Sequence, residues 1–380
     1  MMPSPVYLDH NATTPLDPAA RAAMEPFLGE QFANPSSPYA FARPASRALA
    51  RAREQVAALV AAEPPRVVFT SGGTESNNLA LHAAWSARPE RRHLVISAVE
   101  HASVRAPAQA WVRRGGTLTV VPVSREGALD MDALRRAVTA QTALVSVMAA
   151  NNETGICYPI GEAAELAHRA GAWFHSDAVQ AAGKLSLAAG ACDFLSLCAH
   201  KLHGPKGAGA LLVPAGLAAE PLLAGGEQEF GWRGGTENVA ALAGFGVAAE
   251  LAAAARPAMA ARLRAWHDAF EQAVLDGLPG VLVVGRTQAR LPNTSLLLVE
   301  GVATEALLAR LDLDGYCCSA GSACAAGAPE PSPVLLAQGW DQRGAVLRVS
   351  TGRFTPENAL ENLVPVLLSG VHQLRLTARS

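Results

Sequence analysis

The sequence predicts an α/β protein, in which a large domain around a mainly parallel sheet is joined to a smaller α+β domain. Short runs of Val, Leu and Phe alternate with helical stretches of Ala, Leu and Arg through the first two thirds of the chain, which is typical of a parallel sheet with crossover helices. A long Ala-rich helical pattern then leads into a second group of strands. The 380 residues also exceed one ordinary domain of about 150 residues.

The apolar runs of the large domain predict its strands in chain order. They lie at 67–70, 94–97, 117–121, 144–148, 173–175, 194–197 and 210–213. Helical stretches between several of these strands lie at 76–87, 130–140 and 161–170. Because parallel neighbours need such crossovers, these stretches favour a mainly parallel order.

The second part of the chain begins with the long helical pattern at about 238–277. Strands at 281–284 and 294–299 follow, and a terminal helix begins after Pro356. We therefore assign residues 18–260 to the large domain. Residues 1–17 and 261–380 are assigned to the small domain, which carries Cys324 and Arg348.

Composition excludes several classes of protein. Half of the residues are hydrophobic, 17% are charged and the net charge is -2, so a large core is expected and nucleic acid is not an expected partner. The first 18 residues carry no basic cluster followed by an apolar run, and 239–255 is Ala-rich and includes Glu250, which favours a buried helix over a membrane span. The six cysteines include no CxxC pair, so we assign neither a disulfide framework nor a metal site. A cytoplasmic protein without a membrane partner is expected.

Lysine is rare in this chain. Only three of the 31 basic residues are lysines, namely Lys184, Lys201 and Lys206. An amine can lose its proton and attack a carbonyl, whereas a guanidinium stays charged, so a retained lysine is a candidate for a Schiff base. Lys201 and Lys206 lie beside two histidines and a glycine turn, while Lys184 follows Gly183 in a turn and is interpreted as a solvated loop charge.

Polar segments follow several predicted strands, at the sheet edge where ligands bind in open α/β folds. The segment 71–78, Ser-Gly-Gly-Thr-Glu-Ser-Asn-Asn, predicts an anion-binding helix start, although a glycine turn with an ordinary N-cap explains it equally well. Asp177 follows another strand, where a carboxylate could also cap a turn. An anion cup, a carboxylate and the amine of Lys201 on neighbouring strand ends are the groups that pyridoxal phosphate requires.

A series of short motifs runs almost from end to end of the chain. They are YLDHNATTP at 7–15, NPSS at 34–37, FTSGGTES at 69–76, EH at 100–101, NNETG at 151–155, HK at 200–201, GPKG at 204–207, RGGTEN at 233–238, GSAC at 321–324 and RVS at 348–350. In their common order they resemble the fold type I pyridoxal-phosphate enzymes of the class V aminotransferase group. Within that group the chain closely resembles the cysteine desulfurases of the nitrogen-fixation and iron-sulfur-cluster type.

The resemblance implies roles for residues around the cofactor ring. Lys201 would hold pyridoxal phosphate as an internal aldimine and then move the Cα proton of the substrate. Asp177 would pair with the pyridinium nitrogen. His101 would stack on the ring and shuttle protons, although a histidine at that place is often structural. Asn152 and Gln180 would hydrogen-bond the phenolic oxygen of the ring or the carboxylate side of the substrate.

The resemblance also implies how the phosphate and the substrate are bound. The phosphate would be held by Gly73, Thr74, Cys198 and His200, with Thr236 supplied by the partner subunit of a homodimer. Arg348 would pair with the substrate carboxylate, with Asn34 nearby. The chain departs from the family pattern at Cys198, where the desulfurases usually have Ser, and at Glu227, where a third Gly is common.

Cys324 indicates which reaction, among those of this group of enzymes, the protein catalyses. It lies in a run of small residues at 319–327, which predicts a loop with few large apolar neighbours, whereas a cysteine is otherwise often a small buried hydrophobe. Cys317 and Cys318 fit that buried role. A thiolate at Cys324 could attack the sulfur of cofactor-bound cysteine and carry it away as a persulfide, leaving an enamine that becomes alanine.

These observations predict a homodimeric cysteine desulfurase that converts L-cysteine to L-alanine. The sulfur on Cys324 would pass to an acceptor protein, such as an iron-sulfur scaffold or a sulfur carrier. One alternative is another enzyme of the same fold, an aminotransferase or a lyase acting on selenocysteine or cysteine sulfinate. A second alternative is a catalytically silent scaffold for iron-sulfur assembly, against which Lys201, Asp177 and His101 argue.

Overall fold

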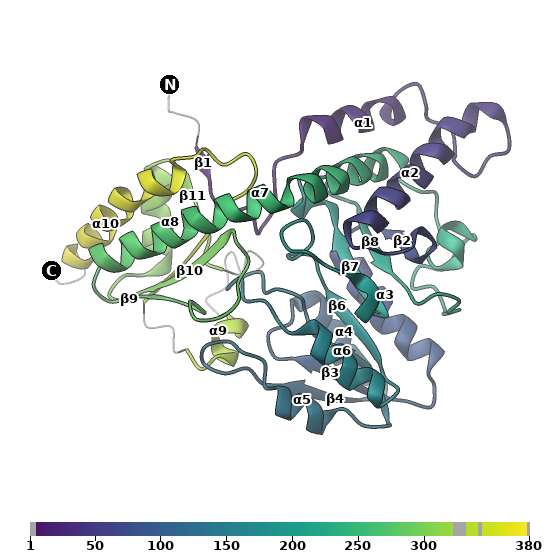
Figure 1. The fold of residues 1–380 in the computed structure, drawn as a ribbon, viewed down its shortest axis with the longest axis horizontal. Helices are drawn as coiled ribbons and strands as arrows, with labels where there is room; N and C mark the ends of the chain where they lie inside the picture. The colour runs from purple at the N-terminus through teal and green to yellow at the C-terminus, as the bar shows by residue number, and fades with distance from the viewer. Residues whose placement is uncertain (1–4, 322–331, 341–343, 378–380) are drawn as a thin grey trace.

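The central sheet occupies the larger part of the molecule (Figure 1). The computed structural model describes residues 5–321, 332–340 and 344–377. The sheet has seven strands in the order β2-β8-β7-β6-β5-β3-β4. Their bounds are β2 Val67–Thr70, β3 His93–Ser97, β4 Thr117–Val121, β5 Thr142–Ser146, β6 Trp173–Asp177, β7 Phe194–Cys198 and β8 Gly209–Leu212. Neighbouring strands are parallel except where β8 pairs with β2 and β7, so the prediction of a mainly parallel sheet is confirmed.

Helices cover both faces of this sheet and make three layers. One face packs against α3 Gly73–Ala87 and α4 Ala102–Arg113. The other packs against α2 Arg43–Leu59, α5 Met131–Ala137, α6 Ile160–Arg169 and the first part of α7 Val239–Gly277. Side chains alternate along a strand, so neighbouring residues of β2 face opposite sides of the sheet. Val68 packs in the core under α3 and α4, whereas Val67 and Phe69 pack in the core on the other face.

A smaller three-stranded antiparallel sheet, in the order β12-β10-β9, has its own core. Its strands are β9 Val281–Val283, β10 Thr294–Val299 and β12 Ala345–Ser350, and its core includes the helices α8 Thr304–Leu313 and α10 Ala359–Thr377. The short helix α9 Pro333–Ala337 places Val334 in a core of the large sheet. The N-terminal segment returns to this part, because β1 Val6–Tyr7 pairs in parallel with β11 Tyr316–Cys317. Leu8 accordingly lies in the same core as Leu297 and Leu347.

Short elements connect the two parts and the strands of the large sheet. They are α1 Pro18–Leu28 and the 3-10 helices η1 Ala40–Ala42, η2 Pro64–Arg66, η3 Ala189–Ala191, η4 Ala199–Lys201 and η5 Gln228–Gly231. Of these, η4 directly follows β7 and carries Lys201 to the edge of the sheet.

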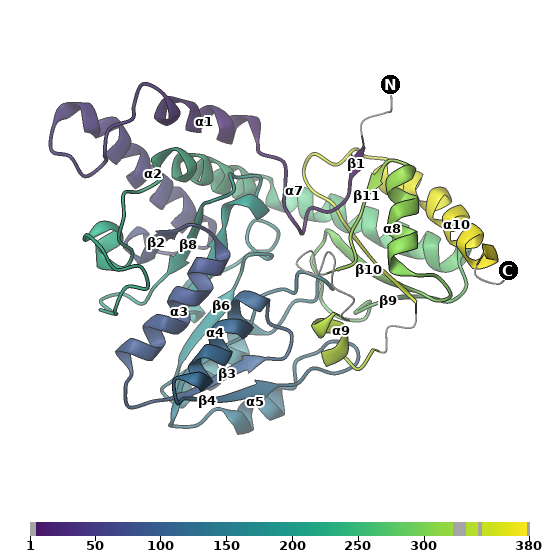
Figure 2. The ribbon, with the colours of Figure 1, turned by 180° about the vertical axis from the view of Figure 1, so that it is seen from behind.

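The long helix α7 runs across both parts of the molecule (Figures 1 and 2). It packs against α1, α2 and α10, with Phe245 in the core of the large sheet and Phe270 in the core of the small one. Within the described ranges it is the one helix whose length and composition would fit a membrane span, and 61% of its most apolar window is buried inside the protein. The division of the chain at residue 260 falls inside this helix and stays a prediction.

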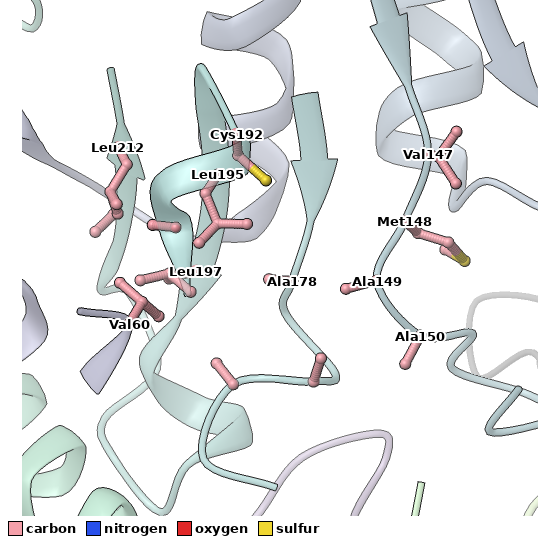
Figure 3. Close-up of a cluster of buried hydrophobic side chains, with 14 of the residues drawn as sticks. Val60, Val147, Met148, Ala149, Ala150, Ala178, Cys192, Leu195, Leu197 and Leu212 are labelled. Atoms are coloured by element: carbon pink, nitrogen blue, oxygen red, sulfur yellow. The ribbon is translucent and has the colours of Figure 1, made fainter. Parts of the chain in front are cut away.

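Strand β5 ends two residues earlier than the sequence predicts, at Ser146 instead of 148. The apolar run continues as Val147, Met148, Ala149 and Ala150, and all four residues are buried although they lie beyond the strand. Figure 3 shows this segment in the same cluster as side chains of β7 and β8. The continuous apolar run therefore shows which residues are buried, but it does not show where the strand ends.

Candidate active site

A cavity of about 510 Å³ lies where the parallel strands of the large sheet end. Most of the residues predicted from sequence line it together. They are Gly73, Thr74, His101, Asn152, Asp177, Gln180, Cys198, His200, Lys201 and Arg348. The volume is within the range of small-molecule sites.

Three predicted site residues are not described as part of this cavity. Asn34 and Thr236 are exposed and are not among the described residues that line it. Cys324 lies outside the described residues. The described residues on either side of its segment are nevertheless close to the cavity. Gly321 O accepts a hydrogen bond from Arg348 Nη1, and Ser332 Oγ donates one to Glu153 Oε2 at 2.5 Å.

Lys201 reaches the cavity from η4. Its Nζ donates to the backbone oxygens of Asn11 and Ala12, the latter at 2.7 Å. Burial lowers the pKa of this amine to about 8, partly opposed by the nearby Cys198. About one tenth of Lys201 is therefore neutral, and able to act as a nucleophile, at pH 7, far more than for an exposed lysine.

Asp177 is the last residue of β6 and points into the same cavity. Its Oδ2 accepts a hydrogen bond from Asn77 Nδ2 at 2.6 Å, and its Oδ1 accepts one from the Val179 amide at 3.0 Å. Asn77 belongs to α3, so the helix and the strand end hold the carboxylate together.

Helix α3 starts at Gly73, and no side chain in the described part of the chain caps its first turn. Its first amides are therefore open toward the cavity, as an anion site requires. A Cβ at Gly73 would lie 2.7 Å from Val179 Cγ2, so close packing requires glycine there. Cys198 lies beside this helix start, and its Sγ is 3.9 Å from the oxygen of Ala208.

The two predicted histidines are both held by polar neighbours. His101 is the N-cap of α4, where its Nδ1 accepts from the Ser103 amide at 3.1 Å and lies 2.7 Å from Ser103 Oγ. Burial lowers the pKa of His101, and the charge of Asp177 partly opposes that shift. His200 Nδ1 lies 3.2 Å from Thr13 Oγ1, and burial lowers the pKa of His200 to about 4, so this ring is neutral at pH 7.

Arg348 is buried in β12, on the opposite wall of the cavity. Its Nη1 donates to Asn152 O at 2.9 Å, and its Nη2 donates to Asp9 Oδ1 at 2.6 Å. Its Nε has no partner among the described residues. That nitrogen is itself buried, so the donor left for a ligand is the second N–H of Nη2, whose one acceptor among the described residues is Asp9.

Sequence reasoning missed Glu100 as a polar group of the site. Its Oε1 accepts hydrogen bonds from Ser97 Oγ at 2.6 Å and from the Met148 amide at 2.8 Å. Its Oε2 is buried without a partner in the described part of the chain, and burial raises its pKa to about 8. The only sequence signal was its place directly before His101.

The interpretation of Lys184 as a solvated loop charge is wrong. Its side chain is buried, and its Nζ donates to Gln180 O at 2.9 Å and to Gln180 Oε1 at 3.2 Å. The turn that carries it packs under α7, because a Cβ at Gly183 would lie 2.9 Å from Ala252 Cβ. A glycine turn with a lysine gives no sequence signal for this burial.

Comparison with known proteins places the chain among relatives of one kind. A cysteine desulfurase of Cereibacter sphaeroides is 46% identical over 97% of this chain and 96% of its own length. A solved structure described as a NifS-like protein superposes with a TM-score of 0.91 at 28% identity, covering 97% of this chain and all of that one. The structure described as SspA in complex with cysteine has a TM-score of 0.82 at 31% identity, covering 92% of this chain and 100% of that one.

These likenesses agree with the fold type I architecture predicted from the sequence motifs, and the first relative covers nearly the whole chain. Residues 6–363 match the family described as aminotransferase class V. The chain belongs to the class V aminotransferase family.

Proposed function

We propose that this protein is a pyridoxal-phosphate-dependent cysteine desulfurase, which converts L-cysteine to L-alanine and holds the released sulfur on Cys324. The observation that carries the proposal is one cavity that combines the amine of Lys201, the carboxylate of Asp177 and the open start of α3. The relatives of similar length named cysteine desulfurase support the choice of substrate.

The residues present fit pyridoxal phosphate. The open amides of α3 at Gly73 suit its phosphate, and the carboxylate of Asp177 suits its ring nitrogen. The buried amine of Lys201, whose pKa is lowered to about 8, suits a covalent link to its aldehyde. When bound, this cofactor supplies an electron sink for charge that develops at the Cα of an amino acid.

Lys201 would first hold the cofactor and then, once the substrate displaces it, move the proton at the substrate Cα. Its Nζ is already held near the cavity by the oxygens of Asn11 and Ala12. His101, fixed at the start of α4 by Ser103, would cover one face of the ring and exchange a proton with the substrate. Both roles need a group that is partly neutral near pH 7, which burial favours for each.

Arg348 would bind the carboxylate of the substrate. Among the described residues its Nη1 already donates to Asn152 and Gly321, whereas its Nη2 donates only to Asp9, so an N–H of Nη2 remains for a carboxylate. Asn34 would join this site only if a rearrangement or a second subunit brings it there, since its side chain is exposed in the single chain.

Cys324 would accept the sulfur. The chemistry of a thiol and the relatives named cysteine desulfurase support this role. The described residues that flank 322–331, Gly321 and Ser332, contact Arg348 and Glu153, which line the cavity. A thiolate attack on the substrate sulfur forms the S–S bond of a persulfide and breaks the Cβ–S bond. The electron pair of that bond stays on the carbon that becomes alanine.

A second copy of the chain would complete the site. Thr236, expected to reach the phosphate of a neighbouring subunit, is exposed here, and the exposed rings of Phe32 and Phe41 stack edge to face 5.4 Å apart on the same molecule. We therefore propose a homodimer in the cytoplasm, which delivers sulfur to an acceptor protein. Sedimentation at micromolar concentration checks the dimer, and a monomer with full activity would contradict it.

The function is tested by incubating purified protein and pyridoxal phosphate with L-cysteine, with and without a reductant. We expect alanine in both cases and a sustained release of sulfide only with the reductant, because the persulfide must be discharged for turnover. A product that retains sulfur, such as a keto acid, would favour an aminotransferase.

A further inference from the structure

Lys184 is a buried lysine that none of the proposed catalytic steps uses. It lies in the turn after β6 and is 7% exposed, and within the described ranges both hydrogen bonds of its Nζ go to Gln180. Burial lowers its pKa to about 7. A buried amine loses its hydration, so the contacts that replace water must be well defined.

The contact with Lys184 decides which way the side-chain amide of Gln180 faces. A lysine offers only donors when charged, so the atom at 3.2 Å from Nζ is the oxygen of the amide. A neutral amine would still hold two N–H groups for the two oxygens of Gln180, so the contact can persist on either side of pH 7. The amide nitrogen must therefore face the other way.

The nitrogen of this amide faces the cavity wall. Gln180 Nε2 donates one N–H to Asn11 O at 2.9 Å, the same oxygen that accepts from Lys201 Nζ. Its second N–H has no partner among the residues described, and Gln180 lines the cavity. A reversed amide would place two acceptor oxygens, Oε1 and Asn11 O, against each other.

We propose that Lys184 is a positioning residue, which holds the amide of Gln180 so that an N–H donor, not an oxygen, meets the bound cofactor. The proposal rests on the proposed function, because the donor matters only toward an anionic oxygen of a ligand in the cavity. A donor at that place stabilises the anionic form of the ligand. It therefore lowers the pKa of the ligand group that becomes this anion when it loses its proton.

The test is a double-mutant cycle read from the visible absorbance of bound pyridoxal phosphate as a function of pH. Lys184→Met keeps the length of the side chain and removes the donor, and Gln180→Ala removes the amide. We expect each single variant to raise the pH midpoint of the absorbance change by about one unit, which is the size of one hydrogen bond to a charged group. The double variant should show no further shift beyond Gln180→Ala.

Two results would overturn the proposal. An unchanged midpoint in Lys184→Met would mean that Gln180 is held without the lysine. A double variant whose shift equals the sum of the single shifts would mean that Lys184 acts as an independent charge. If Lys184→Met fails to fold, Lys184→Gln enters the same cycle, where a shift that persists in the Gln180→Ala background would equally overturn the proposal.

Leu134→Ala is the matched control, because Leu134 is fully buried in α5 and is not among the described residues lining the cavity. It should lower the thermal midpoint of unfolding while keeping the wild-type absorbance midpoint. A failure of the proposed function is seen separately, as wild-type protein that binds no cofactor or makes no alanine. Failure of the positioning role leaves both of those results intact.

Discussion

Lys201 can form a covalent bond to a carbonyl only as a neutral amine, and its buried position lowers its pKa to about 8. Lys201→Arg should therefore abolish the covalent visible adduct with pyridoxal phosphate, because a guanidinium stays charged. Lys206→Arg is the matched control, since Lys206 is exposed. Absorbance spectra of both variants check this expectation, and an adduct that survives in Lys201→Arg would refute the assignment.

The side chain of residue 198 tests whether this position contacts the phosphate of the cofactor. Its Cβ lies 3.7 Å from the position that a Cβ at Gly73, at the start of α3, would take, and a serine hydroxyl there would be a stronger donor than the thiol. Cys198→Ser should slow the loss of cofactor during dialysis against a carbonyl scavenger by about tenfold, because a hydrogen bond to a charged group contributes about 1.5 kcal/mol at the lower end of its range. Faster loss in the serine variant would mean that position 198 serves as apolar packing.

Among the helices, α7 is joined to the connection between β9 and β10 by a buried ion pair. Glu271 in α7 accepts two hydrogen bonds at 2.8 Å from Arg290, and the two side chains are 2% and 5% exposed. Glu271→Ala should lower the free energy of unfolding by about 3 to 5 kcal/mol, because it leaves the guanidinium buried and unpaired. Urea denaturation measures this loss.

The exposed pair of Asp132 and Arg135 in α5 is the control for that experiment. Asp132→Ala should change the free energy of unfolding by less than about 1 kcal/mol, as exposed ion pairs do. Equal losses in Glu271→Ala and Asp132→Ala would show that burial does not set the strength of these contacts.

The bounds of some strands were predictable from the sequence and those of others were not. The strands at 67–70 and 117–121 are observed where predicted, because their apolar runs are bounded by polar residues or turns. The end of β5 was misplaced because buried residues continue past it, and the antiparallel direction of β8 depends on its pairing with distant strands. The burial of Lys184 under α7 likewise depends on residues about 70 positions away, which local pattern does not contain.

More of the candidate site could be predicted from the sequence than the end of β5, the direction of β8 or the burial of Lys184. Asp177, Lys201 and the start of α3 carry chemistry at strand ends, and the parallel order of β2, β6 and β7 brings those ends together. Glu100 was missed because the sequence does not show that its side chain is buried. The burial, and the oxygen it leaves without a partner among the described residues, depend on neighbours brought together by the fold.

For the whole molecule, buried histidines set the response of stability to acid. Burial lowers the pKa of His10, His175 and His267 to about 3, from 6.5 in an exposed state. Below pH 6.5 the unfolded chain binds protons that the folded chain does not, so each histidine favours unfolding by up to about 1.4 kcal/mol per pH unit. Glu100 and Glu153, whose pKa values are raised, act in the opposite sense but are fewer.

We therefore expect the free energy of unfolding to fall as the pH is lowered from 6.5 to 5. Urea denaturation at several pH values measures the slope, and His175→Asn should reduce it by the contribution of about one proton. A wild-type slope of zero, or one that His175→Asn leaves unchanged, would contradict the role of these histidines.

The central claim concerns what the whole protein does to L-cysteine, and the fate of the substrate sulfur tests it most directly. Wild-type protein loaded with pyridoxal phosphate is mixed with L-cysteine without reductant, and both alanine and the mass of the peptide containing Cys324 are measured. We predict about one alanine per active site together with one added sulfur atom on Cys324, and neither product in Cys324→Ser, because a hydroxyl is a far weaker nucleophile than a thiolate. Undiminished alanine from Cys324→Ser, or no added sulfur on the wild-type peptide, would contradict the account.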